Sequence, residues 1–348
     1  MKYIFVVRQL ESGGAEAATI ILGKELFRRG HQIEVWNTGK EAPESLVNWC
    51  DWADVKQINK LSLVNYKKHR DEVLILIDNV GQKYVGVDQS ISIIHSDRTR
   101  RYKQAKSSLK QFIERCKIKR KLSRGHNIII SKKLGIELAP FTVHKPVYIP
   151  NPFDSERVRR LSKQAVEFPH GKLPDSFITH IGRFTETKQQ DLLLSSYLNN
   201  PTLNTSADLV FIGGELKKHK PLMTQLKSEA KLAKLDHKVH FTDNCNNPFA
   251  ILSHSRCLVL CSKTETMGYV LLEAMTLNIP IVTTDTIGAI EVLGEDFPGI
   301  VREGESLTER INHALSHPEK YIKPLTAEYQ LEQVVDQIQA YVNDFLKS

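Results

Sequence analysis

The sequence predicts an α/β fold made of two doubly wound parallel sheets. The chain has 348 residues, the length of two ordinary domains. Short apolar runs alternate with amphipathic helical patterns along the whole chain, which is typical of parallel sheets covered by helices on both faces. The stretch "HKPVYIPNPFD", residues 144–154, interrupts this alternation with three prolines and predicts a stiff connection between two halves.

The alternation predicts eleven strands. In the first half they are residues 3–7, 33–36, 74–77, 91–95, 127–130 and 147–149, and in the second half residues 177–181, 209–212, 239–241, 257–260 and 281–284. Helices are expected at residues 15–29, 189–198, 221–235 and 269–277. The predicted domains are residues 1–148 and 149–325. A last helix, within residues 326–348, has apolar residues at helical spacing, and we expect it to pack back on the first domain.

The composition is that of a globular protein, with 41% hydrophobic and 25% charged residues. No apolar run approaches the ~18–20 residues needed to cross a bilayer. The apolar run at residues 3–7 ends at Arg8, so we interpret it as a buried first strand and not as a signal peptide. A cytoplasmic location is therefore expected.

Cysteine and histidine usage predicts neither disulfides nor a zinc site. The cysteines are Cys50, Cys116, Cys245, Cys257 and Cys261. Their number is odd and no CxxC pair occurs, so free reduced thiols are expected. No His/Cys cluster has zinc-ligand spacing.

The positive charge is concentrated in the first half. Residues 1–150 carry 27 Lys and Arg against 15 Asp and Glu, whereas residues 151–348 carry 21 against 25. Residues 98–133 alone hold 14 basic side chains and one acid, Glu114. Apolar residues such as Leu109 and Phe112 recur there at helical spacing. A basic amphipathic helix over residues 98–124 is typical of a surface that meets anionic lipid or a phosphate-linked substrate; the alternative is a solvated helix face.

Five residues of this segment are the candidates for binding an acceptor or a membrane surface. They are Arg98, Arg100, Arg101, Lys103 and Lys106. A nucleic-acid partner is the alternative for such a basic segment. It is not expected, because few aromatic side chains interleave with the basic ones and no known nucleic-acid motif is present.

The stretch "SKTETMGYVLLEAM", residues 262–275, follows an expected strand and opens an expected helix. Gly268 permits a close turn into the helix. The amides of Met267, Gly268 and Tyr269 would then face outward and form an anion site suited to phosphate. Glu265 lies on the loop, and Glu273 lies about one turn into the helix. The alternative is that both glutamates are ordinary solvated side chains.

Three more stretches place polar residues after expected strands. In "HIGRFTETK", Arg183 and Lys188 bracket a turn before a helix and could bind phosphate, unless they are plain surface charges. Gly13 and Gly14 follow the first strand, but the pattern is not GxGxxG, so a dinucleotide site is not predicted. His95 ends a strand and could contact a sugar hydroxyl or act as an acid or base, unless its role is structural.

These stretches together resemble one known family. "GRFTETKQQDLLL", "FIGG" and "SKTETMGYVLLEAMTLNIPIVTTDTIGAIEVL" are similar to the carboxyl-terminal half of retaining glycosyltransferases of family 4. "SGGAE" near the start and "IPNPFD" at the connection also fit. Glu265 and Glu273 match the E-x7-E pair of that family. The resemblance implies the GT-B fold, in which two Rossmann-like domains face each other across a cleft that binds a nucleotide-sugar.

The resemblance also implies roles for the candidate residues. Arg183 and Lys188 would bind the donor diphosphate and stabilise it as it leaves. Glu273 would bind the ribose hydroxyls, and Glu265 would contact the donor sugar beside the amides of Met267, Gly268 and Tyr269. The Gly13–Gly14 loop would close on the diphosphate, and His95 would contact the transferred sugar.

The expected activity is transfer of a hexose or N-acetylhexosamine from a nucleotide-sugar, most simply a UDP-sugar, to a lipid-linked or lipopolysaccharide-type acceptor. No cofactor or metal is expected, because no DxD motif follows a strand and protein cations can stabilise the leaving phosphate. The basic first half predicts peripheral attachment to the inner face of the cell membrane. A GT-B epimerase or hydrolase is the alternative enzyme class, and a nucleic-acid-binding protein is the alternative outside enzymes.

Overall fold

The computed structural model describes residues 1–8, 14–39, 49, 51–78, 80–96, 99–169, 171–215, 222–243 and 245–347. The chain divides into two compact units. The first is Met1–Asp154 together with Thr326–Ser348, and the second is Ser155–Leu325. The chain therefore leaves the first unit after Asp154 and returns to it at Thr326.

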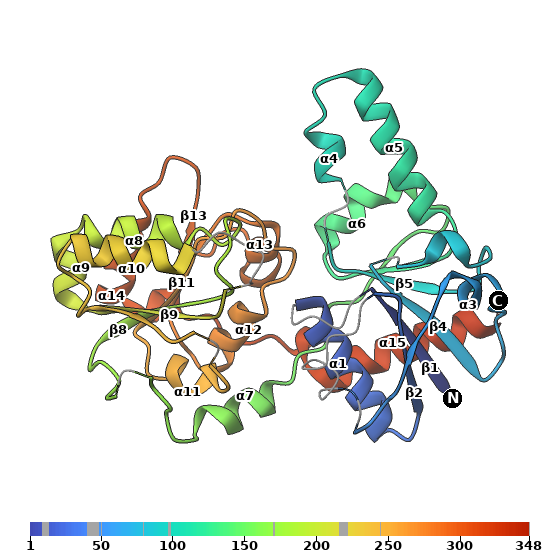
Figure 1. Ribbon diagram of the computed structural model, residues 1–348, viewed down its shortest axis with the longest axis horizontal. Helices are drawn as coiled ribbons and strands as arrows, with labels where there is room; N and C mark the ends of the chain where they lie inside the picture. Colours follow the sequence, from blue (N-terminus) through green and yellow to red (C-terminus); the bar gives the residue numbers. More distant parts are fainter. Residues whose placement is uncertain are drawn as a thin grey trace. The chain divides into compact units, whose positions relative to one another are not determined.

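The described part of the first unit holds a seven-stranded parallel sheet in the order β3-β2-β1-β4-β5-β6-β7 (Figure 1). Its strands are β1 (Lys2–Val7), β2 (Gln32–Asn37), β3 (Asp54–Gln57), β4 (Glu72–Ile77), β5 (Ile91–Ile94), β6 (His126–Ile129) and β7 (Val147–Tyr148). The central strands β1 and β4 are buried from their second residue onward, because helices cover both faces of the sheet.

The helical segments of this unit are α1 (Gly14–Arg28), α3 (Lys60–Val64), η1 (Gln82–Tyr84), α4 (Arg100–Lys103), α5 (Ser108–Leu122), α6 (Lys132–Leu138), η2 (Ala139–Phe141), η4 (Ala327–Tyr329) and α15 (Leu331–Lys347). Helix α15 packs on α1 through a stripe that includes Val334, Ile338 and Val342. Arg29 reinforces this contact, since its guanidinium pairs with Asp336. The carboxyl-terminal helix is thus part of the first unit, as expected from the sequence.

Helices α4 and α5 form a hairpin that stands away from the sheet (Figure 1). Ser107 begins α5 by accepting a hydrogen bond from the Lys110 amide at 3.3 Å. Only the last part of α5 joins the core, through Ile118 and Leu122. The expected single helix over residues 98–124 is therefore wrong: the chain breaks at residues 104–107, where Ser107 caps a new helix.

The second unit contains, among its described residues, a six-stranded parallel sheet in the order β10-β9-β8-β11-β12-β13. Its strands are β8 (Phe177–Ile181), β9 (Asp208–Ile212), β10 (Val239–Phe241), β11 (Cys257–Leu260), β12 (Ile281–Thr284) and β13 (Ile300–Val301). Its helical segments are α7 (Ser155–Ser162), α8 (Gln190–Leu198), α9 (Pro201–Ser206), α10 (Leu222–Leu232), α11 (Pro248–Leu252), α12 (Tyr269–Thr276), α13 (Ile287–Leu293), α14 (Leu307–Ser316) and η3 (Pro318–Tyr321).

All eleven expected strands are present, and the predicted class of two Rossmann-like units is confirmed. Two strands were missed for clear reasons. Strand β3 reads "DVKQ" and has no buried residue, and β13 has only two residues. An edge strand of this kind carries no apolar run for periodicity to detect. Cys116, Cys245, Cys257 and Cys261, the cysteines among the described residues, are free thiols.

Candidate functional site

The strand order of the second unit directs attention to the loops after β8 and β11. The chain runs from β8 outward to β9 and β10, and from β11 outward to β12 and β13 on the other side. Strands β8 and β11 therefore flank the point where the winding direction reverses. Ligands of open parallel sheets bind beyond the carboxyl ends of the strands at such a point. Arg183 and Lys188 follow β8, and Glu265 and Gly268 follow β11.

The loop after β8 is held by its neighbour after β9. Gly213 has a φ of +142° and donates its amide to Asp243 O at 3.0 Å. A Cβ at Gly213 would lie 2.2 Å from Gly182 O, so only glycine fits this close approach. The Gln190 side chain donates to Arg183 O at 2.9 Å. These contacts fix the backbone of Arg183, while its side chain is exposed and makes no hydrogen bond or ion pair with any described residue.

Lys188 and Glu265 are brought into direct contact. The Lys188 ammonium donates to Glu265 Oε1, and the Ser262 hydroxyl donates to the same oxygen at 3.0 Å. The two loops are also joined through the Lys263 amide, which donates to Thr187 O at 2.8 Å. An ammonium has three donors, so Lys188 can keep its contact with Glu265 and still bind a phosphate oxygen.

The segment 265–268 is clamped against the start of α13. The Gly288 amide donates to Glu265 O at 2.8 Å, and a Cβ at Gly288 would lie 2.9 Å from the Met267 amide nitrogen. Helix α12 begins at Tyr269 with Gly268 as its N-cap, which provides no side-chain cap. The first turn of α12 holds no acidic residue. The helix start therefore keeps its partial positive charge for an external anion.

Glu273 lies one turn into α12 and carries a perturbed carboxyl group. Burial raises its pKa to about 7, although the Arg157 guanidinium acts in the opposite direction. Part of the residue still reaches solvent. Burial also raises the pKa of the Tyr269 phenol, and the charge of Glu273 adds to this effect. A half-buried carboxyl that titrates near neutral pH is typical of a functional site and unusual for a surface helix residue.

His180 is buried beneath the loop after β8. Neither ring nitrogen hydrogen-bonds to any described residue. Burial, assisted by Lys188, lowers the pKa of His180 to about 3, so the ring is neutral in the folded protein. The ring lies close to the Lys188 stem, since a Cβ at Gly182 would contact both His180 Cε1 and Lys188 Cδ. His180 thus lines the floor below Lys188 without adding charge.

In the first unit the equivalent reversal lies between β1 and β4. Gly13 is outside the described residues, and Gly14 begins α1. His95 follows β5 and borders a mostly apolar pocket with Thr19 of α1 and Ile338 of α15. The Asp78 carboxylate accepts from the amides of His95 and Ser96, at 2.9 and 3.2 Å. The roles of Gly13, Gly14 and His95 in binding a nucleotide-sugar donor stay predictions.

Of the five basic candidates, two are described with their side chains. Arg98 lies outside the described residues, as do the side chains of Arg100 and Arg101. Lys103 forms an ion pair with Glu137, so part of its charge is neutralised. Lys106 is exposed. No helix in the described part of the chain is long and apolar enough to span a membrane.

Sequence reasoning missed the residues that hold the loops in place. Gly213, Gly288 and Asp78 were not singled out, because each acts through a contact with another segment of the chain. Ser262 was not singled out either, although its partner Glu265 is only three residues away. Gly213 alone carried a local signal, a "GG" pair directly after an apolar strand.

Comparison with known proteins shows what this arrangement is similar to. Residues 162–328 match the family described as "Glycosyl transferases group 1". The matched segment makes up just under half of the chain, and it is similar to glycosyltransferase group 1 domains. It includes both loops of the candidate site, from Arg183 to Glu273.

A curated relative agrees over part of its length. The uncharacterized glycosyltransferase MJ1059 of Methanocaldococcus jannaschii is 32% identical over 145 residues, which is 41% of this chain and 34% of the relative. The chain thus spans about a third of that protein's length in the match.

Two solved structures show the fold of the whole chain. The Anabaena protein Alr3699/HepE, crystallised with UDP, has a TM-score of 0.76 at 15% identity, covering 99% of this chain and 100% of its own. WaaG, a glycosyltransferase involved in lipopolysaccharide biosynthesis, has a TM-score of 0.66 at 14% identity, covering 98% and 95%. The glycosyltransferase domain and these neighbours place the chain in the GT-B fold.

Proposed function

We propose that this protein is a retaining glycosyltransferase of family 4. It transfers a hexose or N-acetylhexosamine from a UDP-sugar to a lipid-linked or lipopolysaccharide-type acceptor, without a metal ion. The observation that carries the proposal is the convergence of Arg183, Lys188, Glu265 and the start of α12 at the strand-order reversal of a glycosyltransferase domain.

The chemistry of glycosyl transfer matches these groups. As the bond from sugar to phosphate breaks, negative charge grows on the diphosphate and positive charge grows on the sugar. Arg183, Lys188 and the α12 amides stabilise the departing diphosphate. Glu265, held by Lys188 and Ser262, accepts from a sugar hydroxyl, and Glu273 accepts from the ribose hydroxyls. Two protein cations beside the phosphate site supply the charge that a metal would otherwise provide.

UDP is supported as the nucleotide by the structural neighbours. Alr3699/HepE was crystallised with UDP, with UDP and glucose, and with UDP-glucose. The residue roles proposed above concern only the phosphates and sugars of the donor. The identity of the nucleobase is therefore proposed from the structural neighbours alone.

We expect UDP, and not GDP, ADP or CMP, to raise the melting temperature of the protein. At about 100 times its dissociation constant, a ligand stabilises the folded state by about 2.7 kcal/mol. The measurement is a thermal-shift panel with and without EDTA, and each UDP shift is referred to ligand-free protein under the same condition. A UDP shift that disappears with EDTA would overturn metal independence. No shift with any nucleotide would overturn the donor assignment.

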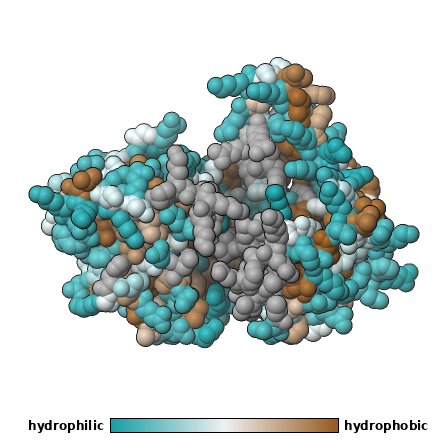
Figure 2. Space-filling model, viewed as in Figure 1, coloured by the Kyte–Doolittle hydropathy of each residue, from teal (hydrophilic) through white to brown (hydrophobic). Residues whose placement is uncertain are grey.

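The acceptor part of the proposal relies on α5. Leu109 and Phe112 expose 70% and 64% of their surface on this helix, surrounded by basic side chains. Figure 2 shows hydrophobic residues gathered near the tip of the α4–α5 hairpin among hydrophilic ones. Exposed apolar side chains within a basic surface fit an anionic membrane or the lipid-phosphate end of an acceptor. We propose that α5 holds the protein at the cytoplasmic face of a membrane.

Changing Lys106, Lys110 and Arg115 together to Gln should weaken binding to phosphatidylglycerol vesicles about 100-fold, because each basic residue contributes about 1 kcal/mol at an anionic surface. The double change Leu109→Ser and Phe112→Ser should weaken it about tenfold. Vesicle co-sedimentation measures both. Leu232→Ser, which alters an even more exposed leucine in the second unit, is the control. Unchanged vesicle binding in both multiple variants would contradict the membrane role.

A further inference from the structure

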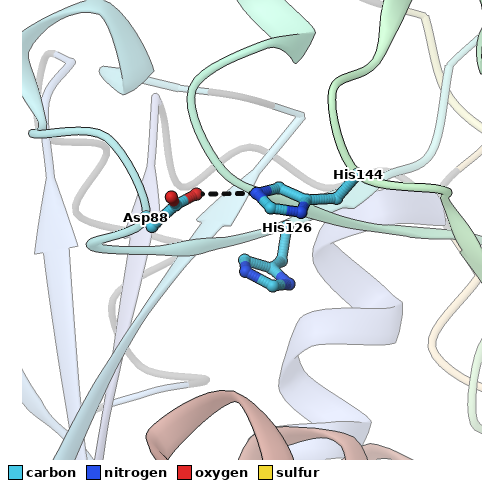
Figure 3. A group of neighbouring side chains, drawn as sticks. All are labelled: Asp88, His126 and His144. Carbon is cyan, nitrogen blue, oxygen red and sulfur yellow. Dashed lines mark hydrogen bonds and ion pairs between the residues drawn. The ribbon is translucent and has the colours of Figure 1, made fainter. Parts of the chain in front are cut away.

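Asp88, His126 and His144 form a cluster in the first unit, far along the chain from one another. Asp88 lies in the loop before β5, His126 is the first residue of β6, and His144 lies before β7. Their ligand-type atoms all lie within 4.8 Å of one another. Figure 3 shows the two imidazole rings one above the other, with the Asp88 carboxylate at the edge of His144. His144 Nε2 and Asp88 Oδ1 are 3.0 Å apart.

We propose that Asp88, His126 and His144 bind a divalent transition-metal ion of the Zn²⁺ class. Two imidazoles and one carboxylate are a donor set that suits Zn²⁺. Metal–ligand bonds of about 2.0–2.2 Å place neighbouring ligand atoms of a tetrahedral ion roughly 3.4 Å apart, close to the His144–Asp88 spacing. The fourth position faces solvent, since Asp88 and His144 are each more than a third exposed.

One ring must turn to complete the site. The rings of His126 and His144 are stacked, with centroids 4.2 Å apart and planes 13° from parallel. Nitrogen lone pairs lie in the ring planes, so two stacked rings cannot aim at one ion. A rotation of the half-exposed His144 ring, or of the His126 ring, would be needed to aim both nitrogens at one ion beside Asp88.

The surroundings of the cluster fit a metal site in two respects. The Tyr341 hydroxyl lies 3.4 Å from His126 Nδ1, a contact that can orient the ring from the side away from Nε2. Asp88 is fixed by its backbone, which has a φ of 56° and donates its amide to Arg124 O at 2.9 Å.

The site is separate from the proposed transfer chemistry. His126 lies at the amino-terminal end of β6, and the other two ligands precede their strands, whereas His95 lies at the carboxyl end of β5. Parallel strands bring these ends to opposite edges of the sheet. The ion would therefore join three loops of the first unit and stabilise it, and the proposal does not depend on the glycosyltransferase assignment.

The experiment titrates the full-length protein with Co²⁺ and with Zn²⁺ alone. The expected result is one tight site per chain, with the visible spectrum of tetrahedral Co²⁺ that Zn²⁺ abolishes, and a higher melting temperature with Zn²⁺. His144→Ala and Asp88→Asn change half-exposed groups and should fold. Each should weaken metal affinity about 100-fold and remove the Zn²⁺-dependent rise in melting temperature.

His313 and His317 supply a matched control in the second unit. Their rings are also stacked, with centroids 4.3 Å apart; His313 lies in the last turn of α14 and His317 is the C-cap of that helix. His317→Ala removes the same kind of ligand and should leave the tight site intact. Loss of the site in His317→Ala, or its retention in His144→Ala and Asp88→Asn, would overturn the proposal.

A gain-of-affinity variant sharpens the test. The Lys68 ammonium acts on His126 electrostatically and lies 3.3 Å from Phe345 O. Because a nearby positive charge repels a divalent ion, Lys68→Met should tighten Zn²⁺ binding about threefold. Metal bound elsewhere would not respond, so unchanged or weaker affinity in this variant would count against the assigned position.

Discussion

Replacing Lys188 with methionine should lower kcat for sugar transfer by about 10²–10³-fold. Methionine keeps the length of the stem that packs over His180 but removes the cation beside the proposed diphosphate. Stability should fall by about 1–2 kcal/mol, because the half-buried Glu265 carboxylate loses its charged partner and keeps the Ser262 hydroxyl. Steady-state kinetics with a radiolabelled donor and a urea titration measure the two effects.

A double substitution separates catalysis from folding. Adding Glu265→Gln to Lys188→Met removes the unpaired carboxylate, so stability should recover while transfer stays low. Lys263→Met is the matched control, because Lys263 lies on the adjacent loop with an exposed side chain. Near-normal transfer by Lys188→Met would disprove the assigned role of Lys188.

Replacing Glu273 with alanine should raise KM for the donor about a hundredfold. Two charged hydrogen bonds to ribose hydroxyls are together worth about 3 kcal/mol or more. Because burial raises the pKa of Glu273 to about 7, the wild-type enzyme should also lose donor affinity as the pH falls below 7, when a protonated carboxyl accepts less well. Glu273→Gln imitates the protonated form. Its kcat/KM should therefore not fall in this way as the pH drops below 7.

The same pKa has a defined effect on stability. A carboxyl whose pKa in the folded state lies above its value of 4.5 in the unfolded chain stabilises the fold fully below pH 4.5, and this contribution is lost as the pH rises through about 7. Glu273→Gln should therefore be more stable than the wild type at pH 8, by on the order of 1–3 kcal/mol. Denaturant titrations at pH 5 and pH 8 test this, with the exposed Glu303→Gln as control. Equal stabilities at pH 8 would show that Glu273 is not desolvated.

The local sequence determined the buried strands, the helices that follow the two site loops and the content of those loops. Short apolar runs specify buried parallel strands wherever they occur, because a strand covered on both faces needs apolar side chains at nearly every position. The glycosyltransferase motifs could be found in the sequence for a similar reason. The proposed phosphate contacts come from loops directly after strands, so the residues of each motif are contiguous in the chain. The edge strands β3 and β13 lacked this signal and were missed.

Only the tertiary structure decided which of these residues meet. Lys188 and Glu265 are 77 positions apart, and they touch because β8 and β11 are neighbours in the sheet. Asp88, His126 and His144 show no ligand spacing in the sequence, yet three loops at one edge of the sheet bring them within 4.8 Å. Local spacing records contacts within a helix or a loop, whereas strand order sets contacts between loops, and strand order is determined by packing of the whole sheet.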